Sequence, residues 1–150
     1  MNDQKDAAPT FHPSLQNENA ERLVLGAILH DNSILDSLLT FLSQEHFAFV
    51  PHSHVYDACQ RLISERGAVD SATLMQSLEY DETLADAGGA ALISSLEQMP
   101  MAQDSVRDAA HMIVDLHLKR ELFQIVNRSL EAAPWGSAID EIEALERQIF

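Results

Sequence analysis

The side chains of this chain that could do chemistry are its histidines, a single cysteine and a run of carboxylates. His46, His52 and His54 lie close together, and Cys59 follows about one helical turn further on. A structural zinc site needs four such ligands at defined spacings. No His-x-x-x-His pair occurs, and His52-Ser53-His54 falls where a loop is expected to enter a helix. The pattern predicts no metal site; we expect His52 to order the start of that helix and His54 to lie on the surface.

Two further patterns lack the companions that catalysis needs. Paired carboxylates can act as general acid and base, and one polar connector holds Glu79, Asp81, Glu82 and Asp86. No basic or nucleophilic residue accompanies them, so a solvated face is the better interpretation. Gly88-Gly89 follows no expected strand and precedes no Lys, Ser or Thr in the place where a phosphate would need one. These glycines are expected to permit a tight turn, and we predict no catalytic residue, metal or cofactor site in this chain.

The charge of the chain points to proteins rather than nucleic acid as its partners. Its 150 residues hold 24 acidic against 9 basic side chains, a formal net charge of −15. Binding a nucleic-acid backbone normally needs a basic stripe that neutralises phosphates, and none is visible. No apolar run is long enough to span a membrane, and no signal-peptide core occurs. Cys59 is alone and forms no internal disulfide, so we expect a cytoplasmic protein with no membrane contact.

The distribution of apolar residues predicts an all-α fold, in which a small helical-bundle head is followed by a long antiparallel helical hairpin. Hydrophobic residues make up 46% of the chain, with only 5 Gly and 5 Pro, and they recur at helical spacing. Residues 1–15 are polar and aperiodic and are expected to form a flexible lead-in. Residues 16–100 form the predicted head, and residues 101–150 form the predicted hairpin.

Capping residues and prolines define the first three helices expected in the head. The first covers residues 19–30, and Asp31 or Asn32 is expected to cap a second, whose apolar positions run from 34 to 42. Pro51 is expected to bar continuation from the preceding loop, so that the third helix begins at Ser53. Gly67 is expected to end that helix as a C-terminal glycine.

The second part of the head is divided in the same way. Asp70 or Ser71 is expected to cap a short fourth helix. Gly88-Gly89 then breaks the chain before a fifth helix, which Pro100 ends. The residues expected to hold the head together are Val24, Gly26, Ile28, Leu38, Leu62 and Leu92.

Gly26 is the most informative residue of the first helix. It lies in the helix interior between Leu25 and Ala27, where Gly costs roughly 1 kcal/mol against Ala. We interpret it as a position at which another backbone passes too close for a side chain.

One long helical pattern from Asp104 to Ala133 and a second pattern after Ser137 predict the hairpin. Residues 134–136, Pro-Trp-Gly, supply the turn between them. Such a hairpin cannot bury both faces against itself, so we expect its apolar stripe to contact a second copy or another protein. The alternative is that it folds back onto the head. The predicted interface residues are Leu116, Phe123, Val126, Leu130, Trp135, Ile142 and Ile149.

A series of short motifs follows along the chain in a defined order and at defined spacings. In chain order these are Ala20-Glu21, Leu25-Gly26, Asp31-Asn32, Phe47, the run from Pro51 to Tyr56, Gly67, Val69-Asp70, Thr73-Leu74, Leu84, Gly88-Gly89, Leu92 and Pro100. Together they resemble the N-terminal domain of DnaB-type replicative DNA helicases, over about residues 13–128. Asp104 departs from the family pattern, which has Asn there, and Ala109-Ala110 has no clear counterpart of the family's Tyr-Ala.

The resemblance implies the collar of a ring-shaped hexameric helicase. In that family the N-terminal domains pair through their hairpins and engage primase and a loader protein, while a C-terminal motor uses ATP and Mg²⁺ to unwind DNA. This chain contains no Gly-x-x-x-x-Gly-Lys-Ser/Thr loop, so the segment alone is expected not to be an enzyme, and the motor would follow Phe150. Two alternatives stay open: a stand-alone collar mimic acting as adaptor or inhibitor, and the helicase-binding C-terminal domain of a primase.

Overall fold

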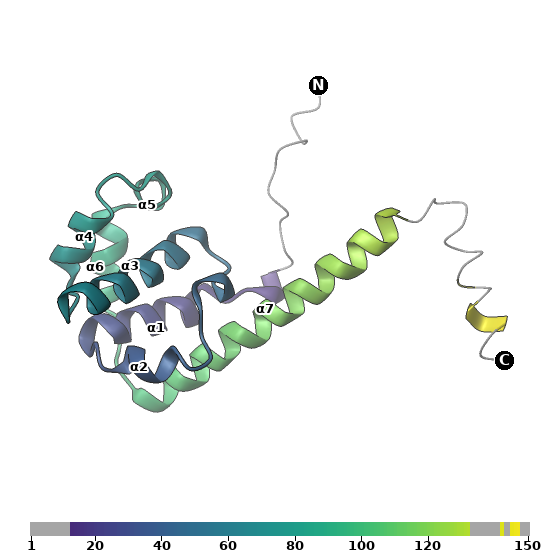
Figure 1. The fold of residues 1–150 in the computed structure, drawn as a ribbon, viewed down its shortest axis with the longest axis horizontal. Coiled ribbons are helices and arrows are strands. Elements are labelled where there is room, and N and C mark those ends of the chain that lie inside the picture. The colour runs from purple at the N-terminus through teal and green to yellow at the C-terminus, as the bar shows by residue number, and fades with distance from the viewer. Residues whose placement is uncertain (1–12, 133–141, 143–144, 148–150) are drawn as a thin grey trace, which may run out of the picture. The chain divides into compact units, whose positions relative to one another are not determined.

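The computed structural model describes residues 13–132, residue 142 and residues 145–147 of the chain (Figure 1). Within these residues all regular elements are helical and no strand occurs, as the sequence predicts. The chain divides into two compact units, residues 1–117 and residues 118–150.

The first unit is built from short helices. In chain order its elements are η1 (Pro13–Leu15), α1 (Glu18–His30), α2 (Ile34–Leu38), η2 (Gln44–His46), α3 (Val50–Arg66), α4 (Ser71–Ser77), α5 (Glu82–Asp86) and α6 (Ala90–Glu97). The long helix α7 (Gln103–Ala132) begins in the first unit and continues into the second.

The core of the first unit is centred on α1. This helix packs against α3 and α6, and α4 packs against the same two helices (Figure 1). The apolar residues predicted to hold the head are buried, except Leu92, which is half-buried and packs against the core. The beginning of α7 completes the core with Val106, Ala110 and Ile113.

Side-chain caps and glycines end these helices largely as predicted. Gly67 has a φ of 82° at the end of α3, and Asp70 caps α4 by accepting a hydrogen bond from the backbone N–H three residues on, at 2.8 Å. Gly88 and Gly89 have φ values of 115° and 54°, a conformation that glycine adopts without strain. Asn17, for which the sequence predicted no role, caps α1 in the same way as Asp70 caps α4.

Of the two predicted caps of α2, Asp31 accepts a hydrogen bond from the backbone N–H of Ser33, the residue directly before the helix, at 3.0 Å, whereas the Asn32 side chain does not cap it. Ser33 precedes α2 and makes no side-chain capping bond. The Asn32 amide instead donates to the carbonyl oxygens of Ile28 at 2.8 Å and Val69 at 3.0 Å, and its oxygen accepts from the Val69 N–H at 2.9 Å. Because an amide donates and accepts at once, Asn32 ties the end of α1 to the loop before α4.

Two other boundaries differ from the prediction for local reasons. Helix α3 begins at Val50 rather than Ser53, because Pro51 lies in the first turn, where its missing N–H costs nothing. Helix α5 lies in the connector that was interpreted as a solvated carboxylate run. Asp81 caps it by accepting a hydrogen bond from the Leu84 N–H at 2.9 Å.

Several predictions for the two ends of the chain fall outside the described residues. Residues 13–15 of the predicted lead-in form η1, whereas residues 1–12 are not described. The predicted turn with Trp135 and the final position Ile149 also lie outside the described residues. Ile142 and residues 145–147 are helical, and the antiparallel hairpin stays a prediction.

Gly26 lies where α1 meets the end of α6. A Cβ atom built on Gly26 would collide with the carbonyl oxygen of Leu96 and lie 2.9 Å from the Cβ of Met99. A backbone atom cannot move aside as the end of a flexible side chain can. The prediction that another backbone passes too close is therefore confirmed.

We expect Gly26→Ala to destabilise the protein even though Ala is the better helix former. Overpacking of this kind costs about 1–3 kcal/mol, which outweighs a helix-propensity gain of about 1 kcal/mol. Urea unfolding followed by far-UV circular dichroism measures the change. Ser64→Ala on the exposed surface of α3 serves as the control and should not lower the free energy of unfolding. A Gly26→Ala variant as stable as this control would contradict the close contact.

Candidate functional site

His52 belongs to a buried pair rather than to a reactive site. Its Nδ1 lies 2.8 Å from Oε2 of Glu21, and both side chains are almost fully buried. The Glu21 carboxylate also accepts hydrogen bonds from the backbone N–H groups of Ala48 and Phe49. His52 thus orders the start of α3, as predicted, and its carboxylate partner lies 31 residues earlier, beyond the reach of a local pattern.

His54 is half-buried and hydrogen-bonded, not a free surface residue as expected from the sequence. Its Nδ1 lies 2.7 Å from Asp81 Oδ2 and 2.9 Å from Thr83 Oγ1. A catalytic triad needs the hydroxyl and the carboxylate on opposite ring nitrogens. Here both contact the same nitrogen, so the imidazole cannot activate Thr83 as a nucleophile. The hydrogen bonds among His54, Asp81 and Thr83 join α3 to α5.

The other candidate groups for chemistry are held in unreactive form. Burial raises the pKa of the Cys59 thiol to about 12 and that of Tyr56, whose hydroxyl donates to the Leu42 carbonyl, to about 12. Among the described residues no group of three or more His, Cys, Asp or Glu side chains could hold a metal ion. No helix in this part of the chain is long and apolar enough to cross a membrane.

The most distinctive surface belongs to the second unit, on α7. Six large apolar side chains there are 43–62% exposed: Leu118, Leu122, Phe123, Ile125, Val126 and Leu130. Ile142 and Leu145 are also exposed, at 58% and 57%. We call the six α7 residues the apolar face. Of the predicted interface residues, Phe123, Val126 and Leu130 belong to this face, whereas Leu116 is half-buried in the first unit.

The apolar face covers about half of the helix circumference. Successive residues of an α-helix are rotated by about 100°, which places all six side chains on one half of α7. Lys119 and Ser129 are the polar exceptions there, and Gln124, Arg128 and Glu131 lie on the other half. An amphipathic helix of this kind normally buries its apolar side against another element.

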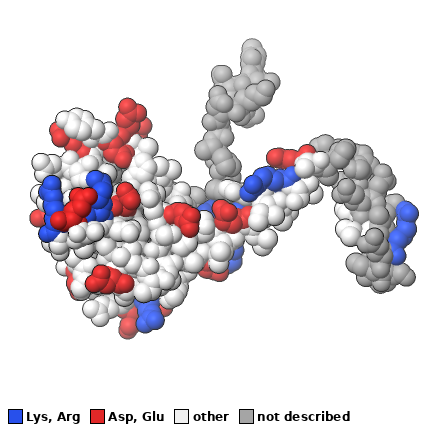
Figure 2. Space-filling model, in the orientation of Figure 1, with Lys and Arg blue, Asp and Glu red and all other residues white. Residues whose placement is uncertain are grey.

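Charged side chains give no sign of a nucleic-acid site on the visible face. Figure 2 shows acidic and basic side chains interspersed over the described surface, with no continuous basic stripe. A sequence with a net charge of −15 repels phosphates unless bases gather locally.

Comparison with known proteins identifies the fold and the family. The family model for the DnaB-like helicase N terminal domain matches residues 14–115. Replicative DNA helicases DnaB of Rickettsia typhi and Rickettsia felis are 30% and 32% identical to this chain, over 99% and 95% of its length. The chain spans only 30% and 29% of the length of these two relatives.

Solved structures agree with the family match. The N-terminal domain of DnaB helicase from Mycobacterium tuberculosis superposes with a TM-score of 0.73 at 25% identity, covering 87% of this chain and 96% of that one. The N-terminal domain of DnaB helicase from Helicobacter pylori superposes with a TM-score of 0.66 at 20% identity. That match covers 75% of this chain and 88% of the Helicobacter pylori chain. The fold is thus that of a helicase N-terminal domain. The chain belongs to the DnaB-like helicase N-terminal domain family, and the resemblance seen in its motifs is confirmed.

The buried Glu21 carboxylate yields a direct test of the head. Glu21→Gln replaces one acceptor oxygen with an NH₂ group that faces other donors. Breaking such a buried, charge-assisted arrangement is expected to lower the free energy of unfolding by about 2–4 kcal/mol. Glu18→Gln on the same helix removes an exposed carboxylate 3.9 Å from Arg22 and should cost less than about 1 kcal/mol. Equal urea midpoints for the two variants would contradict the anchoring role.

Asp81 yields a pH-dependent test. Hydrogen bonds from the Thr83 hydroxyl, the Leu84 N–H and His54 hold the pKa of the Asp81 carboxyl below its usual range. A depressed pKa contributes stability above the unfolded-state pKa of about 3.9, and that contribution is lost as pH falls through the folded-state value. We therefore expect Asp81→Ala to cost about 1 kcal/mol at neutral pH and progressively less in acid.

The control for this pH profile is Asp86→Ala, an exposed carboxylate in the last position of α5. Urea unfolding at several pH values should give Asp86→Ala the same profile as the unsubstituted chain. The free energy of unfolding of Asp81→Ala is compared with that of the unsubstituted chain at each pH. If the difference stays constant into acid, the lowered pKa of Asp81 is not the cause of the lost stability.

Proposed function

We propose that this chain is the self-associating and partner-docking collar of a replicative DNA helicase. The observation that carries the proposal is the apolar face of α7, which lies on a helix of a domain whose family is that of DnaB helicases. Exposed apolar patches of this kind mark interaction sites.

The size of the apolar face is compatible with pairing of two copies. About half of each side chain is left to bury, which contributes roughly 1 kcal/mol per residue. With six such residues on each copy, a symmetric pair gains roughly 12 kcal/mol against an association cost of about 4–15 kcal/mol. Because the gain and the cost of association are of similar size, a polar substitution within the apolar face is expected to shift the equilibrium toward the separate copies.

The remaining parts of the proposal concern the longer protein. The Helicobacter pylori domain is described together with its interactions with primase, which supports primase as a partner here. We further propose a hexameric ring, a loader protein as second partner, and a motor that uses ATP and Mg²⁺ on DNA, all by family membership. The proposed working compartment is the cytoplasm. A stand-alone collar acting as adaptor or inhibitor is the second candidate, because the same surfaces would serve it.

The self-association proposal is tested with Phe123→Asp. Phe123 lies near the middle of the apolar face along the helix axis and outside the head core, so a carboxylate there should oppose pairing without unfolding the head. We expect a lower mass in size-exclusion chromatography with light scattering and a helical content, measured by circular dichroism, equal to that of the unsubstituted chain.

The matched control is Arg128→Gln, which changes the net charge by the same amount. Arg128 is exposed on the polar half of the same helix, so its substitution should leave the oligomeric mass unaltered. An unchanged mass for Phe123→Asp would remove the apolar face from the proposed interface. Equal loss of mass in both variants would attribute the effect to charge alone.

A further inference from the structure

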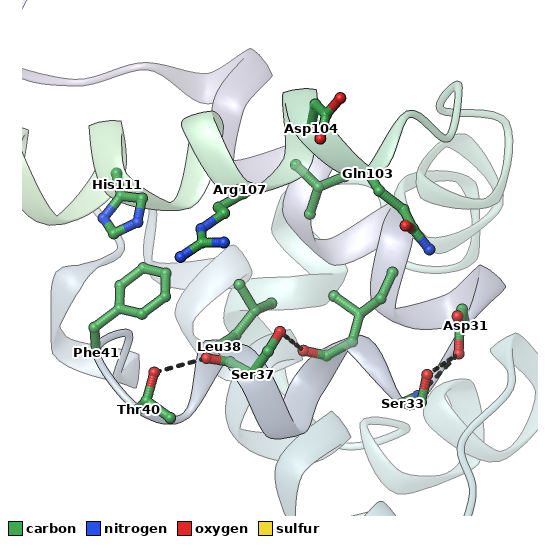
Figure 3. Close-up of a pocket in the computed structure, with 12 residues that line it drawn as sticks. Asp31, Ser33, Ser37, Leu38, Thr40, Phe41, Gln103, Asp104, Arg107 and His111 are labelled. Atoms are coloured by element: carbon green, nitrogen blue, oxygen red, sulfur yellow. Dashed lines mark hydrogen bonds between the residues drawn. The ribbon is translucent and has the colours of Figure 1, made fainter.

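A pocket of about 570 Å³ lies within the first unit, between α2 and the beginning of α7 (Figure 3). One wall is α2 with the turn that follows it, and the other is formed by residues 103–111 of α7. The buried side chains of Leu38 and Val106 contribute its apolar part. Neither the predicted interface nor the apolar face of α7 includes these residues.

One end of the pocket is cationic and aromatic. Figure 3 shows Arg107 extending from α7 between the two walls, near the rings of Phe41 and His111. These rings are stacked, with centroids 4.3 Å apart and an interplanar angle of 7°. The Arg107 guanidinium is exposed and makes no ion pair with any residue that the structure describes. An unpaired Arg in a chain with 24 acidic residues is a ready-made partner for a carboxylate.

The wall formed by α2 offers acceptors instead. The hydroxyls of Ser37 and Thr40 donate their protons to the carbonyls of Ile34 and Ser37, each at 2.8 Å, which leaves oxygen lone pairs free toward a ligand. At the opposite end from Arg107 lies Asp31, whose carboxylate accepts from the N–H and hydroxyl of Ser33 (Figure 3). This end of the pocket therefore favours a donor such as an amide.

The dimensions of the pocket suit a short peptide. Residues 103–111 span about 12 Å of helix at 1.5 Å per residue, the length of about two helical turns of a bound segment. A groove between helices that binds a short amphipathic segment is a known recognition mode. Nucleic acid fits less well, because its successive phosphates need a row of basic side chains, whereas this lining holds the single arginine Arg107, which can pair with one carboxylate.

We infer that this pocket docks a short segment of a partner protein. The segment carries an acidic side chain for Arg107, apolar side chains for Leu38 and Val106, and an amide donor for the Asp31 end. The inference deepens the proposed docking role and names the chemistry of the partner, and it does not depend on self-association through α7. The peptide-binding test and the oligomeric-mass test can therefore fail or succeed independently of each other.

The probes are blocked octapeptides that contain one Glu, one Gln and two Leu residues among alanines, made with both orders of Glu and Gln. Each is titrated into the full ¹⁵N-labelled chain and followed by two-dimensional NMR, beside a counterpart with Lys in place of Glu. We expect the Glu peptide of one order to shift amides of residues 33–41 and 103–111. The Lys counterpart is expected to bind at least about tenfold more weakly, the size of one charge-assisted hydrogen bond.

Arg107→Glu should reverse this preference in favour of the Lys peptide, whereas Arg107→Lys should retain the preference for Glu. The matched control is Arg66→Glu at the end of α3, outside the pocket, which should leave binding unaltered. The NMR spectrum of each variant reports whether it is folded.

Three outcomes would overturn the inference. The first is the absence of shifts in the pocket with every peptide at millimolar concentration, and the second is equal binding of the Glu and Lys peptides. The third is a shift of the same amides on dilution of the chain alone, or on addition of a thymidine oligonucleotide, which would make a second copy or nucleic acid the occupant.

Discussion

The head depends on one buried carboxylate. Removing a charge from water costs several kcal/mol, and the structure must offset that cost with partners of good geometry. Glu21 finds them in the N–H groups of Ala48 and Phe49 and in His52. All three partners lie in or next to the first turn of α3, so the same bonds that satisfy the charge also fix where α3 begins relative to α1. A misplaced loop would leave the carboxylate unpaired, which makes this arrangement selective as well as stabilising.

Helix α1 carries two further constraints of a different kind, and together they explain why it is the centre of the head. At Gly26 the absence of a side chain lets the end of α6 approach within backbone contact. At its C-terminal end the Asn32 amide bonds to the backbone of Ile28 and Val69. Each of these three residues holds a different segment against α1. Glu21 does so by its charge, Gly26 by allowing close approach, and Asn32 by its amide bridge. Apolar burial supplies the bulk of the stability, and these contacts select one arrangement of the helices.

The sequence predicted what is local and missed what joins distant segments. Local features can be recognised within one or two helical turns of sequence. They include the helix periods, the end of α3 at Gly67, the Asp70 cap and the close backbone at Gly26. The partners of Glu21 and the Val69 partner of Asn32 lie 27–37 residues away, so no periodicity could identify them, although the Ala20-Glu21 and Asp31-Asn32 motifs marked the residues. Helix α5 was missed because a five-residue helix held by one cap has little pattern. On α7 a narrow stripe was predicted, whereas the exposed apolar arc is wide enough to add Leu118, Leu122 and Ile125.

The charge and the apolar face of this chain act in opposite directions. Copies with a net charge of −15 repel one another, and that repulsion reaches about one Debye length, roughly 8–10 Å at physiological ionic strength. Contacts on the apolar face act only at van der Waals distance. Nonspecific approach of two copies is therefore opposed everywhere except where enough apolar surface meets at once. Under the proposed self-association, the acidic surface would make pairing of two copies conditional on alignment of their apolar faces. Arg107 makes no ion pair with a residue that the structure describes; in the docking proposed above it would select a partner by charge, whereas the proposed pairing through α7 would select one by shape.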